Sequence, residues 1–277
     1  MKPLEDFILA SARLGELYFD RYLAEQKPIE LKASWRKALE FFFSKVFYQG
    51  RRDKVSDKFK GIADRVIEEV IGKDPDSPND SEIASIKHEL EKEDKRKYNG
   101  KIIISKQLPK EGDRKMVIAT LEFCKRIPYH NIVSFSIDSI NHINKGSLVS
   151  NYNELQEEIH QIGPKVAALY LRDLIQVFSL EESLQQEDLI CLQPIDTWVK
   201  KIIKSFDPAI ESDRELRQWI IDNSKGLGKS SLKVNQGIWA LGARADAILL
   251  CLFHIVPSFS SYFDQLEPPE VFRPDNG

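Results

Sequence analysis

Apolar residues recur at intervals of three and four along most of this chain, and this spacing constrains the fold more than any other feature. Phe7, Leu14 and Tyr18 share one such face. The same spacing runs through MVIATLEFCKRI, KVAALYLRDLIQVF and GIWALGARADAILLCLFHIV. Because an α-helix has 3.6 residues per turn, the pattern predicts about ten helices. Only KIIISKQL, residues 101–108, suggests a strand, so we expect an all-α fold.

The length and local composition bound the domain organisation. The 277 residues suffice for one large core or two modest ones, and no internal repeat is visible. Turn-forming and charged residues gather at the start of the segment 73–130, where we expect a charged insertion or variable segment. The last residues, 264–277, are predicted to be a loosely attached tail. We therefore expect residues 1–277 to form a single unit with these two additions.

Cysteine usage and hydropathy favour a cytoplasmic protein without a membrane partner. The longest apolar run, 247–256, is too short to span a bilayer, and the acidic N-terminus lacks signal-peptide anatomy. Cys124, Cys191 and Cys251 lie far apart in apolar surroundings, which predicts reduced core residues and no disulfide framework. Cys251 and His254 have a ligand-like spacing but no second pair, so we expect neither a metal nor another cofactor.

The charge distribution is more informative than the total. The formal net charge is −3, yet residues 32–60 hold nine Lys and Arg against three Asp and Glu. The stretch NSKGLGKSSLK, 223–233, adds three lysines and no acid. Its GLGKSS portion is a poor phosphate-loop candidate, because Asn223 stands where that motif needs glycine and no strand precedes it. We expect instead a basic loop that contacts a nucleic-acid backbone through Lys229.

The stretch EIHQIGPKVAALYLRDL, 158–174, interrupts a helical pattern and resumes it at once. Gly163 permits a tight turn and close backbone approach, and Pro164 suits the first turn of a new helix. Free N–H groups at such a helix start can receive a phosphate oxygen. The pattern predicts a helix-hairpin-helix with Lys165 at the head of its second helix. The alternative is an ordinary turn between two helices.

A second motif follows at CLQPIDTWVKKI, 191–202. Asp196 stands after an apolar run and Pro194, at the expected start of another helix. Aspartate is a favoured N-cap, so capping alone would explain its position. A lysine in a hairpin followed by Pro-Ile-Asp-Thr-Trp-Val nevertheless resembles the helix-hairpin-helix DNA glycosylase superfamily.

Two more segments carry this resemblance, FFFSKVFYQGRRDKVSDKF at 41–59 and VNQGIWALGARA at 234–245. Asp196 follows Lys165 by 31 positions, a spacing similar to the archaeal 8-oxoguanine glycosylase branch. The chain departs from the superfamily pattern at Gln161, which replaces the hairpin's usual first glycine, and it lacks the four-cysteine iron-sulfur loop of endonuclease III. The resemblance implies a two-lobed fold with a cleft between helical subdomains.

The resemblance also implies a bifunctional DNA glycosylase and abasic-site lyase of base excision repair, acting as a monomer on damaged double-stranded DNA. Lys165 would attack the sugar C1′ and form a Schiff base, which requires the neutral amine, and β-elimination would then nick the strand. Asp196 would stabilise the positive charge that develops on the sugar. The damaged base, 8-oxoguanine in this branch, must first be flipped out of the stack.

Further site residues follow from the same resemblance. Gln161 and Gly163 would hold DNA in the hairpin, and Gln49 would fill the space left by the flipped base, beside Arg51 and Arg52. A flipped base needs an aromatic face and polar groups that read its edge. The candidates for that base pocket are Trp239, Trp198, Asn235 and Gln236. The alternatives are that these four residues belong to the core and that Gln49 is an exposed residue at a helix end.

Two other functions remain open at this stage. One is a glycosylase that removes oxidised pyrimidines. The other is a non-catalytic helix-hairpin-helix protein that recognises DNA without cutting it and keeps both Lys165 and Asp196. Borohydride trapping separates the two classes, because only an enzyme that forms a Schiff base becomes crosslinked to its substrate.

Overall fold

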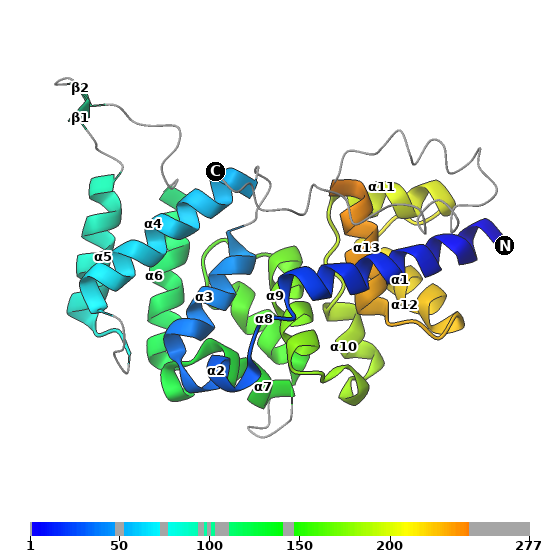
Figure 1. The fold of residues 1–277 in the computed structure, drawn as a ribbon, viewed down its shortest axis with the longest axis horizontal. Coiled ribbons are helices and arrows are strands. Elements are labelled where there is room, and N and C mark those ends of the chain that lie inside the picture. The colour runs from blue at the N-terminus through cyan, green and yellow to red at the C-terminus, as the bar shows by residue number, and fades with distance from the viewer. Residues whose placement is uncertain are drawn as a thin grey trace. The chain divides into compact units, whose positions relative to one another are not determined.

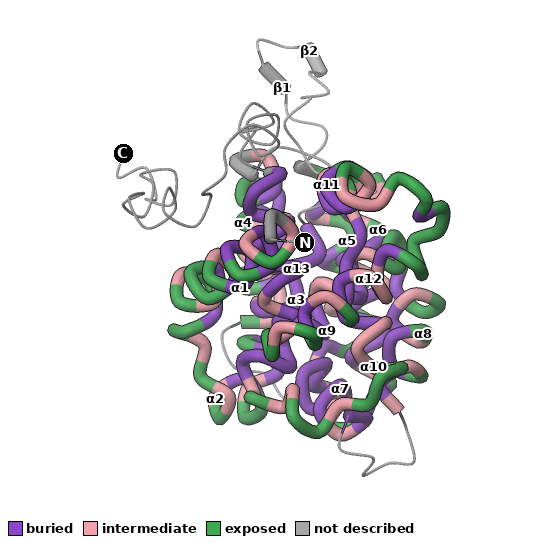
Figure 2. The backbone as a smooth tube through the Cα atoms, turned by 90° about the vertical axis from the view of Figure 1, so that its right-hand side faces the viewer, coloured by how far each residue is buried: buried purple, intermediate pink, exposed green. Residues whose placement is uncertain are grey.

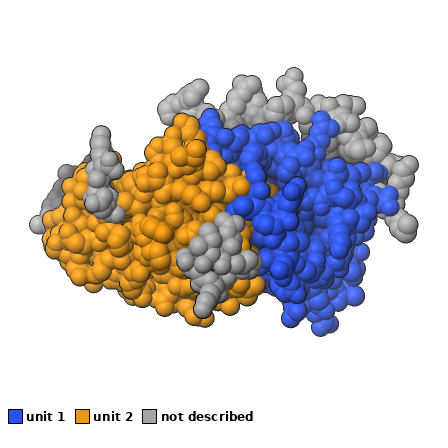
Figure 3. Space-filling view, turned by 90° about the horizontal axis from the view of Figure 1, so that it is seen from below, with its two compact units in different colours: residues 1–26, 179–277 blue, residues 27–178 orange. Residues whose placement is uncertain are grey.

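The computed structural model describes residues 2–47, 53–72, 77–93, 97–98, 101–102, 111–140 and 147–243. These residues form thirteen α-helices, two short 3-10 helices and one two-stranded hairpin (Figure 1). The predicted all-α fold is therefore confirmed. The chain divides into two compact units, which Figure 3 distinguishes by colour. Unit 1 comprises residues 1–26 and 179–277, and unit 2 comprises residues 27–178.

Unit 1 combines the first helix of the chain with helices from its last third. Its helices are α1 (Lys2–Tyr22), α10 (Gln186–Cys191), α11 (Thr197–Phe206), α12 (Asp213–Gly226) and α13 (Ser231–Ala243), with a 3-10 turn at Glu181–Ser183. Phe7 and Ile8 from α1 meet Val199 and Ile203 from α11 in one core, and Ile238 of α13 joins them. This core explains why apolar residues recur at helical spacing in segments nearly 200 positions apart.

Two glycines bring α1 and α13 into backbone contact. A Cβ added to Gly237 would lie 1.8 Å from the carbonyl oxygen of Ser11, and one added to Gly15 would lie 2.0 Å from that of Lys233. Since real Cβ atoms do not approach backbone so closely, the crossing requires glycine at both positions. The helices run antiparallel, because the earlier residue of α1 meets the later residue of α13. The first helix of the chain thus fixes the position of α13.

Unit 2 is a helical assembly whose last two helices, α8 and α9, flank the turn predicted at Gly163. Its helices are α2 (Pro28–Ala33), α3 (Trp35–Val46), α4 (Asp53–Ile71), α5 (Asp80–Glu93), α6 (Glu111–Arg126), α7 (Ile132–Ile140), α8 (Leu148–Glu158) and α9 (Pro164–Val177), with a 3-10 turn at Pro128–His130. Ser34 caps α3, and its Oγ accepts the N–H of Lys37. Most of α9 beyond its first two residues is buried (Figure 2).

A buried ion cluster joins α3 to α9. The Lys45 ammonium lies 3.0 Å from one oxygen of the Asp173 carboxylate, and Arg172 donates to the other oxygen at 2.9 Å. The side chains of all three residues are almost fully buried. Phe42 of α3 adds an edge-on ring contact with Tyr170 of α9, their centroids 4.8 Å apart. Helix α9 is therefore anchored along its length by both apolar and ionic contacts.

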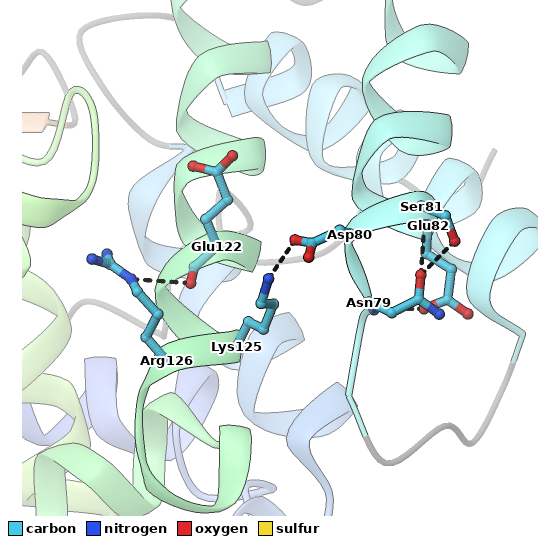
Figure 4. Close-up of polar contacts among 7 residues, drawn as sticks. All are labelled: Asn79, Asp80, Ser81, Glu82, Glu122, Lys125 and Arg126. Carbon is cyan, nitrogen blue, oxygen red and sulfur yellow. Dashed lines mark hydrogen bonds and ion pairs between the residues drawn. The ribbon is translucent and has the colours of Figure 1, made fainter.

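The segment 73–130, expected to be a charged insertion, contains two amphipathic helices. Helix α5 buries Ile83, Ile86 and Leu90, and α6 buries several residues that include Leu121 and Phe123. Most of their charged residues face outward, although Asp113 of α6 is buried. Lys125 of α6 pairs with Asp80 of α5 (Figure 4). The start of α5 is capped within the same group, because Asn79 Oδ1 accepts the N–H of Glu82 at 3.0 Å.

The remaining expectations about the fold are resolved in part. The strand expected at 101–108 is seen only as β2 (Lys101–Ile102), which pairs antiparallel with β1 (Lys97–Tyr98). The predicted tail, 264–277, lies outside the described residues. None of the helices that the structure describes combines the length and the apolar character needed to cross a bilayer.

Candidate active site

The chain turns between α8 and α9 as the hairpin prediction requires. Helix α8 ends at Glu158 with Ile159 as its C-cap, and α9 begins at Pro164. The N–H of Ile162 donates to the carbonyl of Ile159 at 3.1 Å and closes the turn. Within this turn, Gln161 has a positive φ of +67°. Gln161 therefore has the left-handed conformation that normally favours glycine, at the position where the superfamily pattern has its first glycine.

The Gln161 side chain has a contact of its own. It passes over Gly112 near the start of α6, because a Cβ added to Gly112 would lie 1.8 Å from the Gln161 amide nitrogen. Gln161 itself is exposed to solvent. The side chain thus lies across the neighbouring helix, which gives a packing reason for glutamine at a position that glycine could fill.

Gly163 leaves open space over the hairpin. Its φ of −94° and ψ of 178° are accessible to any residue, and nothing lies within 4 Å of an added Cβ. Neither conformation nor packing therefore demands glycine here. The N–H groups of Gly163 and Lys165 donate to no backbone carbonyl among the described residues. Two donors at the start of α9 are accordingly open to an anionic oxygen.

Lys165 is the second residue of α9 and is half-exposed. Its ammonium makes no hydrogen bond or ion pair with any residue of the described ranges. The next residues, Val166, Ala167 and Ala168, are buried. Lys165 therefore lies at the solvent-exposed start of a mostly buried helix, and its amine has no partner among the described residues.

Asp196 caps α11 in unit 1, as its sequence position predicts. Its Oδ1 accepts the N–H groups of Trp198 and Val199, both at 2.9 Å. Its other carboxylate oxygen makes no hydrogen bond with the residues that the structure describes. Asp196 is half-exposed, whereas the four residues before it, 192–195, are buried. One oxygen thus fixes the orientation of the carboxylate, and the other remains available for chemistry.

The four candidate base-pocket residues lie on α11 and α13 of the same unit. Trp239 is partly buried and meets Tyr18 edge-on, with ring centroids 6.0 Å apart. Trp198 is also partly buried, and the Lys201 ammonium lies 5.2 Å from its ring centroid. Asn235 and Gln236 are fully buried. The two tryptophans each keep some exposed surface, whereas the two amides are enclosed by protein.

Of the remaining candidates, the structure describes only Lys229. Gln49, Arg51 and Arg52 lie outside the described residues. Lys229 is exposed in the loop between α12 and α13, which turns at Gly228 with a φ of +62°. Its N–H donates to the carbonyl of Ser224 at 2.9 Å, so the loop backbone is fixed while the ammonium faces solvent.

Sequence reasoning missed Tyr129. This residue is 75% exposed and has a φ of +58°, followed by His130 with a φ of +53°. The next residue, Asn131, anchors the turn, because its amide donates to the carbonyls of Leu31 and Lys32 at 2.9 and 3.1 Å. Two consecutive non-glycine residues with positive φ are energetically costly, and such backbone strain is often found at functional sites. In the sequence Pro-Tyr-His-Asn, histidine is the weak signal for this conformation, because His130 is the residue with positive φ whose type is enriched there.

The buried thiols add no nucleophile to the candidate site. Burial raises the pKa of the Cys124 thiol to about 12 and raises the pKa of Cys191 as well, so both are poor nucleophiles at neutral pH. Cys251 and His254 lie outside the described residues. Within the described ranges, no group of three or more His, Cys, Asp and Glu side chains is arranged to hold a metal ion.

Comparison with known proteins adds no relative. No protein-family model matches the chain, and neither a curated protein nor a solved structure matches it.

Proposed function

We propose that this chain is a bifunctional DNA glycosylase and abasic-site lyase that removes an oxidised base, 8-oxoguanine, from double-stranded DNA. The observation that carries the proposal is the α8–α9 turn. There, a left-handed Gln161, an uncovered Gly163 and an uncommitted Lys165 follow one another within five residues. This turn presents two open N–H donors and an uncommitted amine at one helix start.

The hairpin supplies DNA binding without reading sequence. A phosphate oxygen accepts the open N–H groups of Gly163 and Lys165, aided by the positive end of the α9 dipole. The exposed ring of Tyr129, in the same unit, offers an aromatic face on which an unpaired base stacks. In unit 1, the ammonium of Lys229 adds a backbone contact that carries no sequence preference.

The chemistry divides between Lys165 and Asp196. The neutral Lys165 amine forms a bond to C1′ as the bond from C1′ to the base nitrogen breaks, and the base leaves with a proton. The free oxygen of Asp196 stabilises the positive sugar in the transition state, while its Oδ1 stays on the backbone of α11. The resulting amine adduct opens to a Schiff base, and β-elimination expels the 3′ phosphate.

A panel of duplex oligonucleotides tests the substrate. Each duplex carries one 8-oxoguanine, one oxidised pyrimidine, one abasic site or no lesion, and the products are separated by size after incubation. The proposal predicts excision and nicking at 8-oxoguanine and nicking at the abasic site. Activity on the oxidised pyrimidine alone would assign the other glycosylase class, and binding without excision of any base would make the chain a non-catalytic DNA-binding protein.

A further inference from the structure

Hydrogen bonds to α13 hold the turn that leads into Asp196. The Gln193 amide donates to the Ser231 hydroxyl at 3.1 Å, and the Asn235 amide donates to the Pro194 carbonyl at 3.3 Å. All four of these residues are buried. Two hydrogen bonds thus fix two consecutive residues that lie just before Asp196.

One stripe of α13 makes both these contacts and continues along α11. Ser231, Asn235, Ile238 and Gly242 follow at intervals of four, three and four, so they share a helix face. Ile238 packs in the same core as Val199 and Ile202. A Cβ added to Gly242 would lie 2.3 Å from Trp198 Cβ, so α13 meets the first turn of α11 closely. The stripe supports the turn and the helix start as one surface.

The Asn235 amide is committed to this support. The Pro194 carbonyl lies outside any helix and is buried, and a buried carbonyl without a partner would be costly. A fully buried side chain whose donor is already engaged is poorly placed to read the edge of a flipped base, the role suggested for Asn235 by its sequence position. The structure therefore favours a supporting role for Asn235, in which it holds the Pro194 carbonyl.

We propose that Asn235 is a positioning residue for Asp196, with Ser231 as its companion on the same stripe. This inference rests on the catalytic role of Asp196 in the proposed function. Hydrogen bonds restrain the chain on both sides of the carboxylate: Asn235 holds the peptide two residues upstream, and the N–H groups of Trp198 and Val199 hold Oδ1 downstream. Releasing the upstream side lets the carboxylate move away from the sugar.

Excision kinetics form the first part of the test. The substrate is a duplex carrying a single 8-oxoguanine, assayed well below the melting temperature of each variant. Asn235→Ala should lower the rate constant of base excision by at least about 10-fold, since a displacement of about 1 Å of a catalytic group can reduce a rate about 100-fold. The KM and the preference among lesions should stay unchanged, as should nicking of a preformed abasic site.

A double-mutant cycle separates positioning from base reading. In an Asp196→Asn background, Asn235→Ala should have no further effect on excision, because the group that it positions has already lost its charge. Additive losses, or a changed preference among lesions, would overturn the proposal in favour of base reading. An unchanged excision rate in Asn235→Ala would reduce the residue to a structural role.

Amide hydrogen exchange tests the same link without requiring activity. The N–H groups of Trp198 and Val199 have no partner within their helix other than the Asp196 cap, so their protection reports on the cap. Asn235→Ala should speed their exchange, with the capped first turn of α12 as an unchanged control. Ser231→Ala, which removes the acceptor of Gln193, should act in the same direction if Asn235→Ala fails to fold.

The two readouts keep the claims apart. Unchanged exchange at Trp198 and Val199 in both variants would overturn the positioning claim even if the protein is an active glycosylase. A wild-type protein that excises no base would overturn the proposed function, and the positioning of Asp196 for excision with it, even if exchange increases.

Discussion

Packing requires glycine in the α1–α13 crossing but not in the α8–α9 hairpin. At the crossing, Gly15 and Gly237 each lie against the backbone of the other helix, where no side chain fits. In the hairpin, Gly163 has open space around it and an ordinary extended conformation, while Gln161 takes the positive φ. The crossing uses glycine for packing within the protein, but no contact within the described protein explains Gly163.

This difference bears on the proposed function. A residue that packing requires is explained by the fold itself. Neither packing nor backbone conformation requires glycine at position 163, which lies beside two open N–H donors and an uncommitted lysine, and we infer that it serves the proposed DNA contact. The comparison therefore predicts large stability effects at the crossing and large functional effects at the hairpin and at Asp196.

The largest stability effect is expected at the crossing. Gly237→Ala should lower the free energy of unfolding by about 3 kcal/mol, because its methyl group would overlap the Ser11 carbonyl and force α1 and α13 apart. Gly61→Ala is a matched control in α4, where nothing lies within 4 Å of the added Cβ. The control should raise stability by up to about 1 kcal/mol. Equal effects of the two variants in denaturant titration would contradict the close crossing.

Asp196→Asn should have a small effect on stability and a large effect on base excision. Asparagine keeps an oxygen that can cap α11, so the unfolding free energy should fall by less than about 1 kcal/mol. Loss of the charge should reduce base excision at least about 100-fold, the effect of removing one electrostatic contact in a transition state. Nicking of a preformed abasic site should fall less, because that substrate has already lost its base. A normal excision rate, measured in single turnover, would leave Asp196 with capping alone.

Gly163→Ala should affect binding and spare the fold. The backbone angles suit alanine and the methyl group meets no protein atom, so the unfolding free energy should change by less than about 0.5 kcal/mol. The same methyl group would occupy the space through which a phosphate reaches the N–H donors, and affinity for lesion DNA should fall about 10-fold. Unchanged affinity in a fluorescence anisotropy titration would remove the hairpin from the DNA contact.

The smallest effect is expected at Gln161. Glycine relieves the left-handed strain but loses the side-chain contact over Gly112 and gains freedom in the unfolded chain. Gln161→Gly should therefore raise the unfolding free energy by only about 0.5 kcal/mol. A loss above about 1 kcal/mol in the same titration would show that the contact with Gly112 outweighs the strain.

Local signals in the sequence predicted much of the helical fold. The spacing of apolar residues located the main helices, and the Asp196 cap and the Pro164 helix start lie where the sequence predicted them. Each of these features depends on residues within one or two turns. The α1–α13 crossing could not be predicted in this way, because it depends on which helices meet across more than 200 positions. In sequence, Gly15 and Gly237 are merely weak helix formers.

Local signals determine the site less completely. They located the hairpin and the cap, but they did not predict the positive φ at Gln161, since glutamine has no intrinsic preference for it. The burial of Asn235 was also hidden, because a polar residue in an apolar helix reads equally well as a pocket residue and as a buried support. Tyr129 was missed because tertiary contacts of Asn131 impose its conformation.

Borohydride trapping tests the central claim most directly. Wild-type protein is incubated with a duplex that carries 8-oxoguanine or an abasic site, reduced, and resolved by denaturing electrophoresis beside Lys165→Gln and the control Lys87→Gln, which replaces an exposed lysine of α5. We expect a covalent protein–DNA band for the wild type and for the control. We expect no band for Lys165→Gln, which should still bind the duplex. A band that persists in Lys165→Gln, or its absence from wild-type protein that binds the duplex, would contradict the assignment of Lys165 as the Schiff-base nucleophile.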